Sequence, residues 1–204
     1  MIIDTSLELL RLHSVEGFTL ARVADRLDTV SMALYNYFPS REALLAECAN
    51  HIGKQFVMPQ PRKGQDWKKT LRDWLWTLRD LGERYPVIFK IAGVEGKTSA
   101  GWLRITRVVG TILYHLGFRD KELALNSWLV CLQAHALVQA EVTDGGFHTA
   151  LSLSRLEELE PEEQAHFLML RPYYEGGITS ADVMEAGFAD IVANIERKIP
   201  KNGK

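Results

Sequence analysis

One segment of the sequence constrains the fold more than any other. Residues 18–45 read FTLARVADRLDTVSMALYNYFPSREALL, which places two short helices, a tight turn and the start of a third helix close together. Thr19, Thr29 and Ser40 each precede a helical pattern, so each is suited to cap the helix that follows it. Asp28 separates the first two helices as the turn residue. This spacing predicts a helix-turn-helix, whose second helix stands out from its domain.

Helical periodicity continues along the rest of the chain. Apolar residues recur at helical spacing in nearly every segment, and no convincing alternating strand is present. An all-α fold is therefore predicted. We expect a first helix that ends near Gly17 and a helix that opens at Pro161. The other expected helices cover 41–55, 66–84, 86–92, 99–117, 120–142 and 180–198.

A linker divides the chain into two unequal parts. Met58–Gly64 reads MPQPRKG and holds two prolines and a glycine, which disfavour regular structure. The sequence therefore predicts a three-helix N-terminal domain over residues 1–57 and a larger helical domain over 65–204.

The composition indicates an ordinary globular protein. The chain has 24 Lys and Arg against 26 Asp and Glu, and 47% of its residues are hydrophobic. A net charge of −2 provides no global positive field that would attract nucleic acid. We expect no signal peptide, because no basic run precedes an apolar stretch at the N-terminus. We also expect no membrane-spanning stretch, and hence a cytoplasmic protein with no membrane partner.

Two cysteines, Cys48 and Cys131, lie far apart within helical patterns. We expect them to be buried thiols, which are common in proteins of a reducing compartment. A redox-sensing pair is the alternative.

The second helix of the motif carries side chains suited to DNA. Ser31 and Asn36 can hydrogen-bond base edges, and Met32 can contact thymine methyl groups. The tyrosine hydroxyls of this helix, and Arg41 at the start of the next one, suit phosphate oxygens. The alternative is a plain helical hairpin in which the tyrosines are half-buried.

Residues 2–56 resemble the DNA-binding domain of the tetracycline-repressor (TetR) family of bacterial regulators. The resemblance is carried mainly by Val15–Thr19 and by Leu34–Leu45, LYNYFPSREALL. It implies base contacts from Ser31, Met32 and Asn36, phosphate contacts from Tyr35, Tyr37 and Arg41, and further DNA contacts from Thr19 and Arg22.

Two features depart from the pattern of that family. Asp28 stands where glycine is usual, which predicts a slightly strained turn. The second helix of the motif also contains no Lys or Arg, which predicts modest phosphate binding.

The order of helices after the linker is similar to that of the family's ligand-binding and dimerisation domain. The 120–142 segment is apolar nearly all round, so it requires cover from more than one direction. The 180–198 segment has a stripe of large apolar residues beside small alanines. Two such helices from each of two subunits would form a four-helix interface, so we expect a homodimer. A monomeric bundle core is the alternative.

The larger domain also contains aromatic residues that could line a pocket for a small apolar or amphipathic effector. Each of these residues could instead belong to the ordinary core. The candidates are Trp74, Phe89, Trp102, Tyr114, Trp128 and His135.

Several chemistries are not supported by the sequence. Gly93–Thr98 resembles a phosphate-binding loop but lacks the glycine that should stand five positions before Gly96. The histidines form no metal-ligand spacing with acids or cysteines, and no nucleophile elbow or dinucleotide fingerprint is present. We therefore expect no catalytic residues, no metal and no cofactor.

The sequence thus predicts a DNA-binding transcriptional regulator rather than an enzyme. We expect a repressor that binds a palindromic, double-stranded DNA operator as a homodimer and is released by its effector. The alternative is a helical protein that sequesters a ligand or partner and has lost sequence-specific DNA binding.

Overall fold

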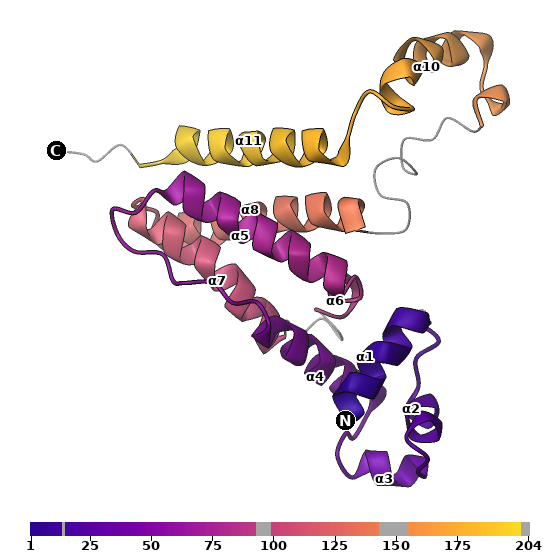
Figure 1. Cartoon of the computed structure of the whole chain (residues 1–204). Coiled ribbons are helices and arrows are strands. Elements are labelled where there is room, and N and C mark those ends of the chain that lie inside the picture. Colours follow the sequence, from indigo (N-terminus) through magenta and orange to yellow (C-terminus); the bar gives the residue numbers. More distant parts are fainter. Residues whose placement is uncertain (14, 93–98, 143–154, 201–204) are drawn as a thin grey trace.

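The N-terminal helices form a compact group at one end of the molecule (Figure 1). The computed structural model describes residues 1–13, 15–92, 99–142 and 155–200, and these contain helices but no strand. Thr19 caps the second helix, and Ser40 Oγ accepts a hydrogen bond from the Ala43 amide at 3.1 Å, as predicted. The elements of this group are α1 (Ile2–Leu12), α2 (Leu20–Arg26), α3 (Ser31–Tyr35) and α4 (Arg41–Lys54).

The turn between α2 and α3 differs from the prediction in one respect. The Thr29 amide donates to the carbonyl oxygen of Ala24 and the Asp28 amide to that of Asp25, at 3.0 and 3.2 Å. These two bonds form a Schellman motif that closes α2, so Thr29 still belongs to the end of that helix. Val30, not Thr29, is the N-cap of α3, and it forms no side-chain capping bond. Asp28 has a φ of +52°, in the left-handed region that favours glycine, so the strained turn predicted at this position is confirmed.

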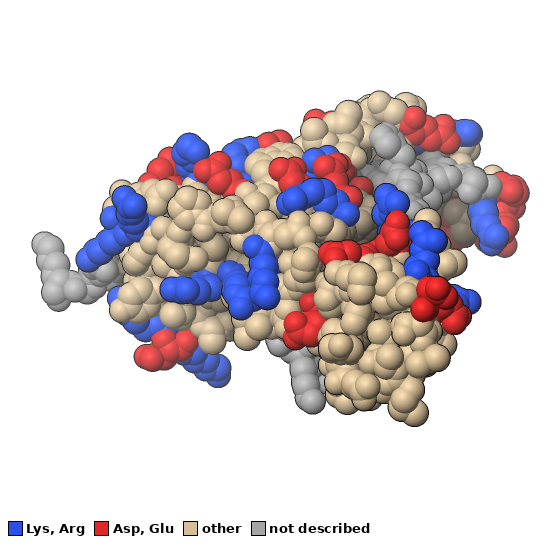
Figure 2. Space-filling model, turned by 60° about the horizontal axis from the view of Figure 1, so that its bottom comes forward, with Lys and Arg blue, Asp and Glu red and all other residues tan. Residues whose placement is uncertain are grey.

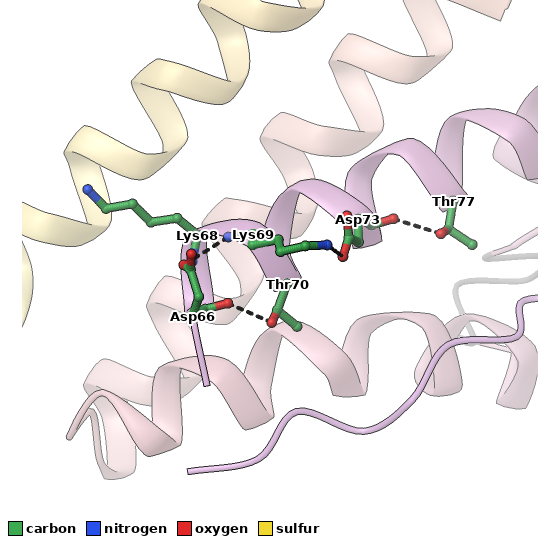
Figure 3. Close-up of polar contacts among 6 residues, drawn as sticks. All are labelled: Asp66, Lys68, Lys69, Thr70, Asp73 and Thr77. Atoms are coloured by element: carbon green, nitrogen blue, oxygen red, sulfur yellow. Dashed lines mark hydrogen bonds and ion pairs between the residues drawn. The ribbon is translucent and has the colours of Figure 1, made fainter. Parts of the chain in front are cut away.

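The first helix after the linker begins where the sequence predicted. In α5 (Trp67–Arg84), Asp66 Oδ1 accepts hydrogen bonds from the Lys68 and Lys69 amides at 3.0 and 3.1 Å (Figure 3). Lys69 then pairs with Asp73 one turn later, and Lys68 extends toward the last helix, where it pairs with Glu196. The later elements are α6 (Ile88–Ile91), α7 (Ala100–His115), α8 (Asp120–Val142), the short 3₁₀ helix η2 (Leu156–Glu158), α10 (Pro161–Tyr174) and α11 (Ser180–Lys198).

Two helices are shorter than predicted. α1 ends at Leu12, well before Gly17, with extended backbone at His13. α6 is only four residues long, with Val87 as its N-cap and Ala92 as its C-cap. The bounds of α8 and α11 agree with the prediction. Gly93–Thr98 and residues 143–154, with their glycine pair and His148, lie outside the described residues.

A single buried core connects the two domains through α4 and α7. Ala49 and Ile52 of α4 and Ile105 of α7 are all fully buried in it. The two helices cross at Gly53 and Gly101, where a Cβ on Gly53 would lie 2.3 Å from the Gly101 Cα. Only glycine permits backbones to approach this closely. The small domain is therefore packed directly against the larger one.

Both cysteines are buried and free, as predicted. Burial raises the pKa of the Cys48 and Cys131 thiols to about 12, because it penalises the charged thiolate. At neutral pH both therefore stay protonated and unreactive.

The expected absence of a membrane-spanning stretch stays a prediction, because α8 passes a test of length and composition that core helices also pass. This helix is long and apolar enough to cross a membrane, by length and composition alone, although only 28% of its apolar window is buried within the chain. Lys121 and Glu122 are followed by eighteen residues without Asp, Glu, Lys or Arg. Most of this apolar window is therefore not buried within the single chain.

Candidate DNA-reading surface and apolar pocket

The outer side of α3 and its flanking residues is exposed and almost free of charge. Val30, Met32 and Tyr37 are 69%, 72% and 71% exposed, while Leu34 on the inner side is only 2% exposed. Ala24 of α2, four positions before the turn residue Asp28, is fully buried. Leaving large apolar side chains in water is unfavourable. A surface that exposes several of them together is therefore suited to a partner. The structure therefore leaves Met32 and Tyr35 of α3, with the flanking Val30 and Tyr37, accessible to a partner.

The structure brings most of the predicted DNA-contacting residues to this surface. Asn36 is exposed, Tyr35 is 50% exposed, and Ser31 is half-buried at the first position of α3. From α2, Thr19 is the exposed N-cap residue. Arg22 is exposed as well, with its Nη1 donating to the Gly17 carbonyl oxygen at 2.7 Å. Contact of these residues with DNA stays a prediction.

The electrostatics of this surface are weak. Residues 29–38 include no Lys, Arg, Asp or Glu. Figure 2 shows the consequence: the lower right lobe, which holds the N-terminal helices, is mostly uncharged on the face in view. These ten residues therefore offer no cation for counterion release, so any base recognition by them would rest on shape and hydrogen bonding.

Arg41 has a structural role that the sequence did not reveal. Its Nε donates to the Phe18 carbonyl oxygen at 2.8 Å, its Nη2 donates to the carbonyl oxygen of Val15, and its Nη1 pairs with Glu42 at 3.0 Å. These bonds attach the start of α4 to the loop between α1 and α2. The guanidinium is thus turned inward, and a phosphate contact could use only its remaining N–H groups.

We predict that Arg41→Ala lowers the stability of the N-terminal domain. Hydrogen bonds to a charged donor contribute about 1.5–3 kcal/mol, and the Val15 and Phe18 carbonyl groups would lose theirs. Thermal unfolding followed by circular dichroism measures the effect. Arg11→Ala is the control, because exposed Arg11 forms no ion pair with any described residue. Equal melting temperatures for the two variants would contradict the structural role.

An apolar pocket of about 260 Å³ lies between α6, α7 and α8. This is close to the lower end of the range for small-molecule sites. Trp128 and Leu132 are 62% and 52% exposed, so the pocket is open on the α8 side. The lining residues are Phe89, Ala92, Trp102, Trp128, Cys131, Leu132 and His135.

His135 is the polar group of this pocket. Its ring meets the rings of Phe89 and Trp102 edge-on, with centroids 5.0 and 5.7 Å away, and its Nε2 hydrogen-bonds Gln139 Oε1 at 3.0 Å. Burial lowers the pKa of His135 below 6.5, against a smaller opposite effect of the Gln139 hydrogen bond. The pocket therefore offers apolar walls and one neutral imidazole at neutral pH.

The lowered pKa of His135 predicts a specific pH dependence of stability. The unfolded chain binds a proton at His135 near pH 6.5, while the folded chain resists it, so stability falls as the pH drops through that value. The contribution cannot exceed about 1.4 kcal/mol per pH unit for one proton. When the pH is lowered from 7.5 to 5.5, the melting temperature of the His135→Gln variant should fall by less than that of the unmodified protein. His13→Gln, at an exposed histidine, is the control and should behave like the unmodified protein.

Two of the six predicted pocket residues lie elsewhere. Trp74 is 1% exposed in the core, where its Nε1 donates to the Ile105 carbonyl oxygen at 2.9 Å. Tyr114 is 50% exposed near the end of α7, and the Arg119 guanidinium stacks 4.0 Å from its ring centroid. Conversely, Ala92, Cys131 and Leu132 were missed. For Cys131 and Leu132, the helical spacing from Trp128 and His135 was the available signal.

No group of three or more histidine, cysteine or acidic side chains that could hold a metal ion occurs among the described residues.

Comparison with known proteins agrees with this geometry. Residues 2–48, which include α1, α2 and α3, match the model of the bacterial regulatory proteins of the tetR family. The chain therefore carries a TetR-family DNA-binding domain. No curated protein matches the sequence significantly.

Several solved structures share the fold of this protein over nearly its whole length. A putative transcriptional regulator from Streptomyces coelicolor A3(2) is 24% identical, with a TM-score of 0.69 over 98% of this chain and 96% of that one. A possible TetR family transcriptional regulator from the same organism is 21% identical, with a TM-score of 0.77 over 96% and 97%. The Streptomyces coelicolor TetR family protein ActR, solved in complex with actinorhodin, is 19% identical, with a TM-score of 0.75 over 98% and 97%.

Proposed function

We propose that this protein is a transcriptional regulator that binds an operator through α3 and is released by a small apolar or amphipathic effector. The observation that carries the proposal is the exposed, uncharged surface of α3 within a TetR-family domain. An exposed apolar surface of this kind is unfavourable in a monomer without a partner, whereas Met, Ser and Asn side chains match base edges in the major groove.

The pocket between α6, α7 and α8 is the proposed effector site. Its walls are aromatic and apolar, and His135 is its one imidazole, so an aromatic or amphipathic molecule with a hydrogen-bonding group would fit best. ActR, which shares the fold, has been solved with actinorhodin bound. That likeness supports a ligand-responsive role but does not identify this protein's effector.

The pocket is connected to the reading surface through the α4–α7 crossing. Asn50 Oδ1 of α4 accepts a hydrogen bond from the Gly101 amide at 3.0 Å, and Trp102, the next residue of α7, lines the pocket. We propose that an effector favours one arrangement of the two domains over another. It can shift this equilibrium only by the difference between its affinities for the two arrangements.

We further propose a homodimer formed by α8 and α11. One side of α8 exposes Leu125, Trp128 and Leu132 to solvent. α11 packs against α8 near Gly187, where an added Cβ would lie 2.5 Å from Leu137, and exposes small alanines on its other side. Burying both sides against a second copy would give a four-helix interface and a two-fold protein, which suits a palindromic operator.

Fluorescence anisotropy with duplexes from upstream of the protein's own gene tests DNA binding. We expect saturable, salt-sensitive binding to one duplex, at least tenfold stronger than to a random duplex of equal length. Ser31 and Asn36 variants should change which sequence is preferred. Equal affinity for both duplexes would favour a protein that only sequesters a ligand or partner.

Light scattering of the same sample tests the dimer independently of DNA. We expect a particle of twice the 23.1 kDa chain mass at micromolar concentration. A 23 kDa particle would exclude the proposed interface.

A further inference from the structure

A hollow of about 340 Å³ lies where the linker between the two domains passes the C-terminal end of α7. The linker runs beside α7 on its way to the start of α5 (Figure 1). The volume is within the range of small-molecule sites. The hollow shares no lining residue with the effector pocket, and its Ile112 lies ten residues, or about 15 Å, beyond Trp102 of that pocket along α7. It is therefore a separate candidate site.

The walls of this hollow are mostly apolar. Ile112 is buried, and Trp67 and Leu116 are half-buried against the hydrophobic core. Thr70 is buried as well, and its hydroxyl donates to the Asp66 carbonyl oxygen at 2.7 Å, so that proton is not available to a ligand (Figure 3). The walls are therefore suited to the apolar body of a small molecule.

Two exposed cations, Arg62 and Lys63, also line the hollow, and none of its lining residues is an Asp or Glu. Neither cationic side chain forms a hydrogen bond or ion pair with a described residue. A tight turn fixes the backbone that carries them. The Gln65 amide donates to the Arg62 carbonyl oxygen at 3.2 Å, and Gly64 has a φ of +82°, which favours glycine. The turn thus holds both cations beside the apolar walls before any ligand binds.

Positive charge extends beyond the hollow along the two segments that form most of it. Residues 48–65 and 99–119 together hold six Lys and Arg and no Asp or Glu, in a chain whose net charge is −2. On the α5 side, Asp66 accepts hydrogen bonds from the Lys68 and Lys69 amides, and the side chains of both lysines are paired with acids. The uncompensated cations of the linker and α7 therefore give this region a positive field that attracts anions.

His115 adds a hydrogen-bonding group to the hollow. Its Nδ1 is buried and has no hydrogen-bond partner among the described residues. A buried N–H without an acceptor is rarer than a buried lone pair without a donor, so the neutral ring is expected to carry its proton on Nε2. The imidazole then has an Nε2–H donor for an acceptor atom of a ligand.

We propose that this hollow binds a small organic anion, a carboxylate with an aromatic or apolar body, at a site distinct from the effector pocket. Arg62 and Lys63 would pair with the carboxylate, and His115 would donate to it. The body would lie against Trp67 and Ile112. Hydrogen bonds to a charged group are roughly twice as strong as neutral ones, so the site should prefer a carboxylate to an alcohol of the same shape. The inference depends neither on DNA binding nor on the dimer.

Isothermal titration calorimetry of the full-length chain tests the proposal with two probes, 2-naphthoate and the uncharged 2-naphthalenemethanol. We expect naphthoate to bind about tenfold more tightly than the alcohol. A chain that carries both Arg62→Gln and Lys63→Gln should bind naphthoate about tenfold more weakly than the unmodified protein and should bind the alcohol equally well. Both positions are exposed, so the melting temperature should not change.

The matched control carries Lys54→Gln and Arg104→Gln. These substitutions remove two exposed cations from the same acid-free segments, but neither residue lines the hollow. This chain should bind naphthoate within about twofold of the unmodified protein, because screening weakens distant surface charges. Trp128→Ala, at an exposed residue of the effector pocket, should also leave naphthoate binding unchanged.

Each other outcome would overturn the proposal. Naphthoate that fails to bind at millimolar concentration, or that binds no more tightly than the alcohol, would show that the hollow does not recognise a carboxylate. Equal weakening in the two doubly substituted chains would indicate a general effect of charge. Binding that Trp128→Ala abolishes, and that Arg62→Gln with Lys63→Gln leaves intact, would place naphthoate in the effector pocket instead.

Discussion

Gly53→Ala is expected to lower the melting temperature of this protein by about 6–12 °C, from a loss of about 3 kcal/mol. The new Cβ would lie 2.3 Å from the Cα of Gly101 and 2.7 Å from its carbonyl carbon. Both are backbone atoms, so no side chain can move aside to relieve the overlap. The α4–α7 crossing must open instead. Thermal unfolding followed by circular dichroism measures the change.

Gly110→Ala is the matched control for this prediction. Gly110 lies in the same helix as Gly101, but a Cβ there would meet only Ser127 Oγ, at an ordinary 3.7 Å. Alanine is the better helix former by about 1 kcal/mol, so this variant should melt at or slightly above the temperature of the unmodified protein. If Gly53→Ala melted together with Gly110→Ala, the close crossing of α4 and α7 would be wrong.

Opening the crossing should also affect the response to effector. The Asn50 hydrogen bond to the Gly101 amide and the pocket residue Trp102 both lie at this contact. A Gly53→Ala protein that still folds should bind its operator, yet its operator affinity should respond less to the effector. Full retention of the response would show that coupling does not pass through this crossing.

The second large effect is expected at the reading surface itself. Met32→Glu should weaken operator binding by about 2–6 kcal/mol, or roughly 30- to 20,000-fold, because each disrupted half-site costs about 1–3 kcal/mol and a dimer has two. The carboxylate would face the phosphates of the major groove in place of an apolar side chain. Since Met32 is 72% exposed, the melting temperature should not change. Fluorescence anisotropy with the preferred duplex measures the loss.

Val57→Glu adds the same charge at a position that is 80% exposed but lies outside the helix-turn-helix. It should leave operator affinity within about threefold of the unmodified protein, as expected for a single screened surface charge. Equal losses in the two variants would indicate a general effect of charge, and the assignment of α3 as the reading helix would fail.

Local signals in the sequence predicted most helix boundaries. Thr19 and Ser40 cap their helices as expected, and Asp66 and Ser99 cap the helices expected to begin at those positions. A capping bond joins a side chain to an amide two or three residues away, so it can be predicted locally. Thr29 was the exception. Its amide closes a Schellman motif at the end of α2, and a capping residue in the sequence does not reveal which of two helices will use it.

Contacts between distant residues could not be predicted in the same way. Arg41 stands in the family's motif and suits a phosphate, but its guanidinium reaches carbonyl groups 23 and 26 positions earlier in the chain. The Gly53–Gly101 approach is equally invisible, since glycine within a helical pattern usually indicates only weak helix propensity. For the same reason, the sequence could not show which aromatic residues of the larger domain line the pocket. Phe89, Trp102, Trp128 and His135 meet in the pocket, whereas Trp74 and Tyr114 do not.

The sequence by itself determined the helical fold, the position of the helix-turn-helix and the residues that α3 presents. These depend on periodicity, caps and turn residues, whose interactions span only a few positions. Only the tertiary structure decided how each helix is rotated about its axis, and therefore which aromatic side chains enclose a cavity and where two backbones touch. Rotation is set by the packing of whole helices against one another, and no short stretch of sequence contains that information.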